Sequence, residues 1–243
     1  MSRISHSSHD FDGIRLHHTS GFGDAWLAEM WNQCVSGTTD RISRWQIPAN
    51  DGQKEIAVYV KIYRKRPSHR LLKRVLPSRA LQEGKGYLEF ARRGIKTVPL
   101  IAWGEERRWG LWQQGVIVTE AIDARTVEEE YTLHNDPDLL VKTAQQLSRI
   151  HNVGLAHGDP LARNFLATAE TPTPFDLPSW SHRTVKSQRQ DLIRFLGSMW
   201  ALTGNKKMTQ TLLSCYREKM DDLPLNTEDL LCEAEEYSRK KQT

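Results

Sequence analysis

The sequence predicts an α+β fold in two unlike parts, with strands in the first half and helices in the second. Two observations lead to this prediction. Residues 55–63 alternate between aliphatic and other side chains as a strand does, and residues 136–154 repeat their apolar positions as an amphipathic helix does. We place the boundary near residues 122–125, which gives a strand-rich part over residues 1–121 and a smaller helical part over residues 122–243.

The first fifty residues are expected to form short strands and loops that lead into a hairpin with its turn at residues 50–52, Asn-Asp-Gly. The second strand of this hairpin has one aliphatic face, made by Ile56, Val58, Val60 and Ile62. Lys61 belongs to the opposite face, because successive side chains of a strand point to opposite sides of the sheet.

One helix is expected in the first part, over residues 78–94, where Gly94 stands in the position of a C-terminal capping glycine. Gly84 and Gly86 weaken its helix propensity. Two strands are expected to follow, over residues 98–105 and 114–122, separated by a charged turn at residues 105–108.

The second part is expected to begin with the helix over residues 136–154, which ends at Gly154. Its apolar stripe consists of Leu140, Ala144, Leu147 and His151. Three further helices are predicted over residues 187–202, 208–220 and 227–240.

Composition excludes several classes of protein. No segment has the roughly 18 consecutive apolar residues of a membrane-spanning helix, and the first residues lack the apolar core of a secretory signal, so we expect a cytoplasmic protein. The three cysteines contain no C-x-x-C pair and are expected to be reduced thiols, neither a disulfide framework nor a zinc site.

The net charge of +4 is concentrated in one segment. Between residues 61 and 96 there are twelve Lys or Arg and only two Glu. Such a basic segment indicates an anionic partner, which could be nucleic acid, membrane lipid or a phosphorylated substrate. The segment contains no groove-reading or base-stacking motif, so nucleic acid is the least favoured of the three.

The residues between 157 and 166, HGDPLARNFL, combine groups that phosphoryl transfer needs. Transfer from ATP requires a lysine at the phosphates, a glutamate that orients it, a carboxylate near the substrate hydroxyl and ligands for Mg²⁺. The chain supplies candidates in the order in which a kinase has them, namely Lys61, Glu83, Asp159, Asn164 and Asp176.

With these residues in place, the chain resembles the protein-kinase-like fold, and within it the lipopolysaccharide core kinases that phosphorylate Kdo or heptose. The narrower likeness rests on VYVKIYRKRP with the basic residues after it, SRALQEGKGYLEFARRGIKTVPLIAWGE, IVTEAI, GLAHGDPLARNFL and RQDLIRFLGS. It spans roughly residues 58–198 and implies two lobes, of which the first is an antiparallel sheet with one helix.

The resemblance also implies a role for each residue. Lys61 would bind the α and β phosphates of ATP and pair with Glu83, and the backbone from Glu120 to Ile122 would hold adenine. Asp159 would be the catalytic base, and Asn164 with Asp176 would bind Mg²⁺. Asp191 would brace the catalytic loop, and His157 would be structural. The implied acceptor is the lipopolysaccharide inner core, reached at the inner face of the inner membrane, where the basic segment would contact anionic lipid.

The chain departs from protein kinases in three places. No G-x-G-x-x-G motif precedes Lys61, where only Gly52 is present, and Asp176 lies in PFDLPS where protein kinases have Asp-Phe-Gly. No Ala-Pro-Glu segment is present to dock a peptide, so a small-molecule or glycan hydroxyl is the better acceptor.

Two alternatives stay open at this point. One is another kinase of the same fold, similar to aminoglycoside and choline phosphotransferases or to small Bud-type protein kinases. The other is a pseudokinase that binds without turnover, although the presence of all five candidate residues argues against it.

Overall fold

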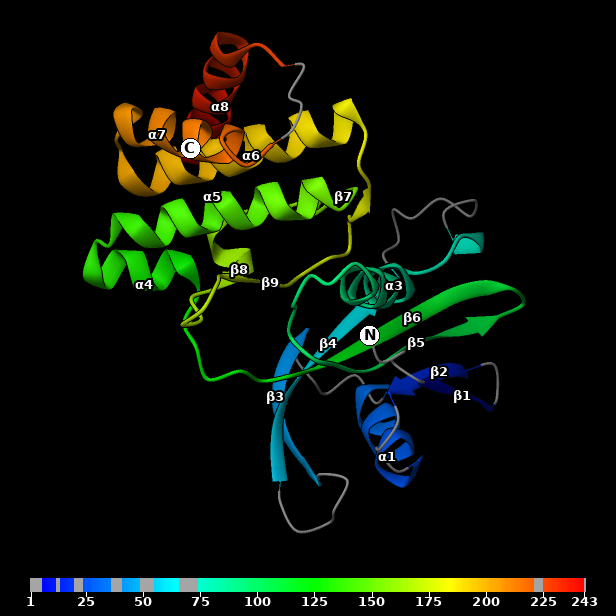
Figure 1. Cartoon of the computed structure of the whole chain (residues 1–243). Helices are drawn as coiled ribbons and strands as arrows, with labels where there is room; N and C mark the ends of the chain where they lie inside the picture. Colours follow the sequence, from blue (N-terminus) through cyan, green and yellow to red (C-terminus); the bar gives the residue numbers. More distant parts are fainter. Residues whose placement is uncertain are drawn as a thin grey trace. The chain divides into compact units, whose positions relative to one another are not determined.

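The computed structural model describes residues 6–11, 14–19, 24–35, 41–48, 55–65, 74–220 and 225–242. The chain divides into two compact units, of which the first comprises residues 1–92 and 98–122 and the second residues 93–97 and 123–243 (Figure 1). The second unit, which we expected to be the smaller, holds slightly more of the residues.

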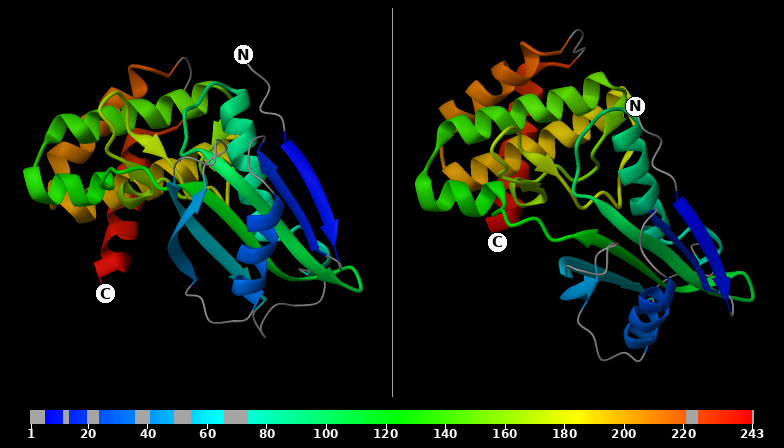
Figure 2. Two further views of the ribbon diagram at one scale, coloured as in Figure 1. Left: turned by 90° about the horizontal axis from the view of Figure 1, so that it is seen from below. Right: turned by 60° about the horizontal axis from the view of Figure 1, so that its bottom comes forward.

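The first unit is built on a six-stranded antiparallel sheet with the strand order β1-β2-β5-β6-β4-β3 (Figure 2). Its strands are β1 (His6–Phe11), β2 (Ile14–Thr19), β3 (Ile42–Pro48), β4 (Glu55–Arg64), β5 (Leu100–Arg108) and β6 (Leu111–Glu120). Strands β3 and β4 pair from Ile42↔Lys61 to Pro48↔Glu55, which confirms the predicted hairpin. Its predicted turn at residues 50–52 lies outside the described residues.

The alternation in β4 gives the sheet two different faces, as predicted. Val58, Val60 and Ile62 are buried in a core with Met30 and Trp31, which belong to α1 (Asp24–Val35). The other face packs against α3 (Arg79–Arg92), the predicted helix, and Gly94 after it has φ 74°. Lys61 therefore lies on the side of the sheet that α3 covers.

Two details of the first unit were predicted wrongly. Helix α1 occupies a stretch that we expected to hold only strands and loops, so the first unit has a helix besides the single one predicted. The turn between β5 and β6 lies at Trp109 and Gly110, because the charged residues 105–108 continue β5. Both turn residues have positive φ, 50° and 74°, as a two-residue type I′ hairpin turn requires.

The second unit is mainly helical. It contains α4 (Val127–His134), α5 (Pro137–Asn152), α6 (Val185–Thr203), α7 (Lys206–Arg217) and α8 (Thr227–Gln242). Helix α5 packs on α7, and α6 packs on α7 and α8. Helix α4 was not predicted, whereas α5 to α8 confirm the four helices that were. The predicted stripe of α5 is fully buried, from Leu140 to His151, and Gly154 follows it with φ 81°.

Short irregular elements connect α5 to α6. They are β7 (Leu155–Ala156), the 3₁₀ turn η1 (Ala162–Asn164), β8 (Phe165–Leu166), β9 (Thr173–Pro174) and β10 (Ser181–His182). β7 pairs with β10, and β8 pairs with β9. Asp159, Asn164 and Asp176 lie in this connection, whereas Asp191 lies on α6. Among the described helices, none combines the length and the apolar character needed to cross a bilayer.

Candidate active site

In the first unit, the structure brings Lys61 and Glu83 together. The Lys61 ammonium lies 3.2 Å and 3.4 Å from the two carboxylate oxygens of Glu83, and Glu83 is 2% exposed. Lys61 lies on β4 and Glu83 on α3, so the ion pair connects the sheet to the helix that covers it. Without a partner a buried carboxylate would be costly, and the pair therefore holds the ammonium in one place.

Tyr63 completes this arrangement and was not identified from the sequence. Its hydroxyl donates a 2.5 Å hydrogen bond to Glu83 Oε2, and its ring lies 5.0 Å from the Lys61 ammonium. The only sequence signal for it was the strand period, which places residues 61 and 63 on the same face. Tyr63 thus fixes both partners of the ion pair.

Gly84 explains how α3 comes close enough to the sheet for this contact. A Cβ atom at Gly84 would lie 2.3 Å from the Trp103 ring on β5, far inside van der Waals contact. The glycine that weakens the helix propensity of α3 is therefore required where the helix passes over Trp103. Glu83, the neighbouring residue, lies at this close approach.

The segment proposed to hold adenine lies at the end of β6. Glu120 pairs with Val58, and its backbone N–H donates to the Pro99 carbonyl at 2.9 Å. The Ala121 N–H donates to the Ala57 carbonyl at 2.8 Å. These two N–H groups are used within the sheet, so a nucleotide base at this segment would have to use carbonyl groups or the N–H of Ile122.

In the second unit, the loop after β7 brings Asp159 and Asn164 into direct contact. The Asn164 side-chain amide donates to the Asp159 carboxylate at 3.2 Å and to the Asp159 backbone carbonyl at 2.8 Å. The Leu161 N–H donates to the same carbonyl, and the Ala162 N–H donates to the Ser198 hydroxyl of α6. The loop between β7 and η1 is therefore fixed by its own backbone as well as by α6.

Gly158 is a position where the loop admits no side chain. It has φ 86°, and a Cβ atom there would lie 2.1 Å from the Ser179 carbonyl oxygen. The glycine of the HGD triplet is thus required twice, by its left-handed backbone and by the close approach of the segment that follows Asp176.

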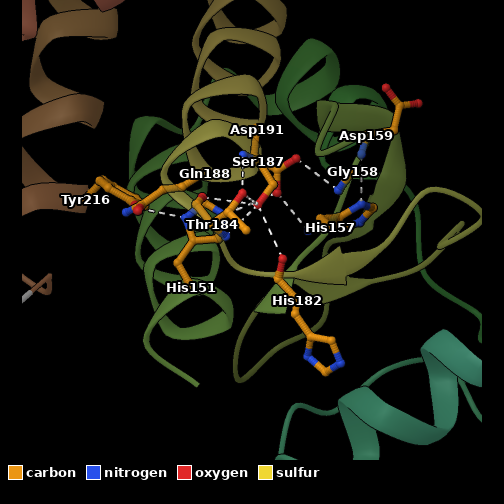
Figure 3. A network of polar contacts seen from close by, with 10 residues as sticks. All are labelled: His151, His157, Gly158, Asp159, His182, Thr184, Ser187, Gln188, Asp191 and Tyr216. Atoms are coloured by element: carbon orange, nitrogen blue, oxygen red, sulfur yellow. Dashed lines mark hydrogen bonds and ion pairs between the residues drawn. The ribbon is translucent and has the colours of Figure 1, made fainter. Parts of the chain in front are cut away.

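Asp191 of α6 accepts three hydrogen bonds and braces this loop (Figure 3). Its carboxylate receives the backbone N–H groups of His157 at 2.7 Å and Gly158 at 2.9 Å, and the Nε2 atom of His151 at 3.1 Å. The bracing role implied for Asp191 by the resemblance agrees with this geometry.

A buried polar chain extends from Asp191 (Figure 3). Tyr216 Oη lies 2.6 Å from His151 Nδ1, and the Gln188 side chain donates to Tyr216 Oη at 2.7 Å. A proton on His151 Nε2 suits the contact with the Asp191 carboxylate, and Nδ1 would then accept from the tyrosine hydroxyl. Burial raises the pKa of Tyr216 above its usual value, so the hydroxyl remains a donor. Sequence reasoning missed Gln188 and Tyr216, whose role depends on contacts between distant residues.

His157 is fully buried beneath the loop and packs against Phe165 at a ring separation of 5.3 Å. Burial lowers the pKa of His157, although the negative charges of Asp191, Asp176 and Asp159 act in the opposite direction. A neutral, enclosed imidazole cannot reach a substrate. The expectation that His157 is structural agrees with this environment.

Asp176 follows the β8–β9 hairpin, which returns the chain to the loop. The Phe175 N–H donates to the Asn164 carbonyl at 3.0 Å, so residue 175 lies directly beside Asn164. Asp176 itself has φ 60°, a left-handed conformation that is strained for a residue with a side chain and that tends to occur at functional sites.

The side chains of Asn164 and Asp176 carry the kind of oxygen ligand that a magnesium site would need. The Asn164 amide nitrogen is directed at Asp159, so the amide oxygen is the atom that can act as a ligand. Oxygen ligands are those that Mg²⁺ prefers, and Mg²⁺ usually takes only one or two carboxylates with phosphate and water. Within the described part of the chain, no cluster of three or more His, Cys, Asp or Glu is placed to hold a metal. A nucleotide phosphate would therefore have to supply further ligands.

Comparison with known proteins identifies the fold. The chain is similar to the solved structure of WaaP in complex with acyl carrier protein, with 19% identity and a TM-score of 0.56 over 88% of this chain and 95% of that chain. It is also similar to an aminoglycoside-3′-phosphotransferase of type VIII, with 13% identity and a TM-score of 0.58 over 86% of this chain and 98% of that chain. At these identities the likeness shows the fold alone, and it confirms the predicted kinase-like α+β fold.

A search among curated proteins finds no match to the chain. The model of one protein family does match, and it covers residues 35–216, which is well over half of the sequence. Its match includes every candidate residue from Lys61 to Asp191. The chain therefore belongs to the lipopolysaccharide kinase (Kdo/WaaP) family, and it is a kinase.

Proposed function

We propose that this kinase transfers the γ-phosphoryl group of ATP to a hydroxyl of heptose or Kdo in the lipopolysaccharide inner core. The observation that carries the proposal is the loop that Asp191 braces, which holds the Asp159 carboxylate against Asn164. Membership of the lipopolysaccharide kinase family supports the choice of acceptor.

The proposed reaction assigns one task to each group. The sugar hydroxyl attacks the γ-phosphorus, its proton passes to Asp159, and ADP leaves. Lys61, held by Glu83, binds the α and β phosphates, and the backbone from Glu120 to Ile122 binds adenine. Asn164 and Asp176 hold Mg²⁺, which neutralises charge on the phosphates.

We further propose that the protein acts at the cytoplasmic face of the inner membrane. The basic segment, residues 61–96, carries charge complementary to an anionic lipid surface, where each Lys or Arg contributes about 1 kcal/mol. Its members Arg66, Arg70 and Lys73 lie outside the described residues.

A second kinase activity stays open, because an aminoglycoside phosphotransferase shares the fold. Phosphate transfer from radiolabelled ATP should be measured with purified lipopolysaccharide, aminoglycosides and a generic protein substrate. Transfer to lipopolysaccharide alone supports the proposal, and transfer only to an aminoglycoside or a protein contradicts it. Mass spectrometry of the inner-core oligosaccharide with and without the gene identifies the sugar.

A matched pair of variants tests Asp159 and separates an active kinase from a pseudokinase. Asp159→Ala should lower kcat by about 10²- to 10⁴-fold, because it removes the proton acceptor. Asp229→Ala, at an exposed position of α8 in the same unit, should keep the wild-type rate. Circular dichroism checks that both variants fold. Substantial residual transfer by folded Asp159→Ala removes this residue from the proposed role.

A further inference from the structure

One end of the first unit exposes apolar side chains that a water-soluble surface rarely shows. Trp109 in the β5–β6 turn is 97% exposed, and Val75 and Leu76 are each 58% exposed. The turn projects at the end of the sheet (Figure 1). A tryptophan this exposed, at a turn position with positive φ, does not contribute to the core of the unit. Its exposed apolar ring therefore indicates contact with another molecule.

Hydrogen bonds hold these residues together as one surface. The Arg107 guanidinium donates to the carbonyls of Val75 at 3.1 Å, Leu76 at 3.0 Å and Gly110 at 2.6 Å. Glu105 fixes this guanidinium by an ion pair and also accepts the Ser78 N–H at 2.8 Å. The β5–β6 turn and the chain before α3 are therefore a single preformed structure.

A basic cavity of about 490 Å³ opens beside this surface. Four of the side chains that line it are cationic, namely Arg41, Arg64, Lys65 and Arg79. Its apolar wall includes Leu76 and Trp112, and none of the described residues that line it is acidic. The cavity therefore favours an anionic group attached to an apolar body.

We propose that this end of the first unit, called the tip surface and formed by Val75, Leu76, Trp109 and the basic cavity, docks on an anionic phospholipid bilayer. Trp109 enters the interface, where the amphipathic indole ring is most stable, and the cavity receives a lipid phosphate. This inference rests on the proposed function, because it specifies which residues hold the kinase at the membrane.

Charge complementarity selects this occupant. Four cations with no acidic group among them attract anionic head groups, and the adjacent exposed side chains suit the apolar region just below those groups. A soluble phosphate compound would use the cavity but would leave Trp109 and Val75 in water. The bilayer accounts for both features.

Flotation with lipid vesicles tests the proposal on the full chain. Wild-type protein should bind vesicles of phosphatidylcholine with phosphatidylglycerol and should not bind pure phosphatidylcholine. Trp109→Asn should lower the partition coefficient several-fold, because asparagine tolerates the positive φ but has no apolar ring. Leu133→Gln changes an apolar residue of α4 that is 59% exposed, about as much as Val75 and Leu76, and should bind as the wild type does.

Two charge variants decide whether binding is local. The double variant Arg41→Ala and Arg79→Ala should lower partitioning by about 25-fold, since each cation near the surface contributes about fivefold. The double variant Arg44→Ala and Lys85→Ala removes two exposed charges of the same unit outside the cavity and should have a much smaller effect. An equal loss in both, or unchanged binding of Trp109→Asn, overturns the proposal.

Activity measurements separate this inference from the proposed function. Trp109→Asn should phosphorylate a deacylated, water-soluble inner-core oligosaccharide at the wild-type rate and a vesicle-embedded acceptor more slowly. If the protein phosphorylates neither acceptor, the proposed function fails, whereas the vesicle measurements stand by themselves. If the wild type phosphorylates both but never binds vesicles, the docking proposal alone fails.

Discussion

Replacing Asp191 by asparagine tests whether one buried carboxylate holds the catalytic loop. The side chain is 1% exposed, and its oxygens accept from the backbone of His157 and Gly158 and from His151. Asparagine keeps the shape but turns one acceptor into a donor. At least one buried N–H therefore loses its partner, whichever way the amide points.

The expected cost follows from these three hydrogen bonds. One unsatisfied buried donor costs about 1–3 kcal/mol. Each of the two remaining hydrogen bonds weakens by about 1 kcal/mol, because the acceptor is no longer charged. Asp191→Asn should therefore lower the free energy of unfolding by about 3–5 kcal/mol. That is a large part of the 5–15 kcal/mol that is typical of a domain.

Urea unfolding followed by far-ultraviolet circular dichroism measures this change. Asp229→Asn makes the same chemical substitution at an exposed position of α8 and should change stability by less than about 0.5 kcal/mol. Below the urea transition, folded Asp191→Asn should also transfer phosphate more slowly, because the loop that carries Asp159 is less well held. A loss of stability under about 1 kcal/mol would refute the bracing role of Asp191.

Three further predictions concern other parts of the molecule. Gly84→Ala should lower the free energy of unfolding, measured in urea, by about 1–3 kcal/mol, because the added methyl group overlaps the Trp103 ring. This loss is expected even though alanine is the better helix former. A stabilised variant would contradict the close approach of α3 to Trp103. Tyr63→Phe removes the hydrogen bond from the tyrosine hydroxyl to Glu83. In steady-state kinetics it should raise KM for ATP about fivefold, which is equivalent to about 1 kcal/mol. An unchanged KM would show that this hydrogen bond is dispensable. Burial lowers the pKa of His157, so the unfolded chain binds its proton first, and stability should fall as the pH drops below about 6.5. His157→Gln should lack this pH dependence. The free energies of unfolding of the wild type and the variant, plotted against pH, should therefore differ in slope by at most about 1.4 kcal/mol per pH unit. Parallel plots would count against a neutral buried ring.

The sequence predicted those features that depend on local periodicity. The strand period placed Lys61 opposite the aliphatic face of β4, and the helical period identified α5 with its buried stripe. Helix α1 was missed although Leu27, Met30, Trp31 and Cys34 are spaced at helical intervals, a period that the expectation of strands and loops did not use. The turn was misplaced because Glu105 looks like a loop residue, although an ion pair with Arg107 keeps it buried in β5.

The candidate site was predictable in part for a similar reason. The order of Lys61, Glu83, Asp159 and Asn164 along the chain was visible, and the structure brings together the two members within each unit. The residues that hold them were not visible. Tyr63 reaches Glu83 across 20 residues, and contacts of this kind leave no trace in local patterns.

The buried polar chain behind Asp191 has a consequence for how this sequence can change over evolutionary time. Gln188, His151 and Tyr216 each satisfy a neighbour that would otherwise be an isolated buried polar group. A substitution at one of them leaves the others unpaired, so replacements should be accepted as sets. Related sequences that lack the tyrosine should therefore also differ at the histidine or the glutamine, although residues 151 and 216 are far apart in the chain.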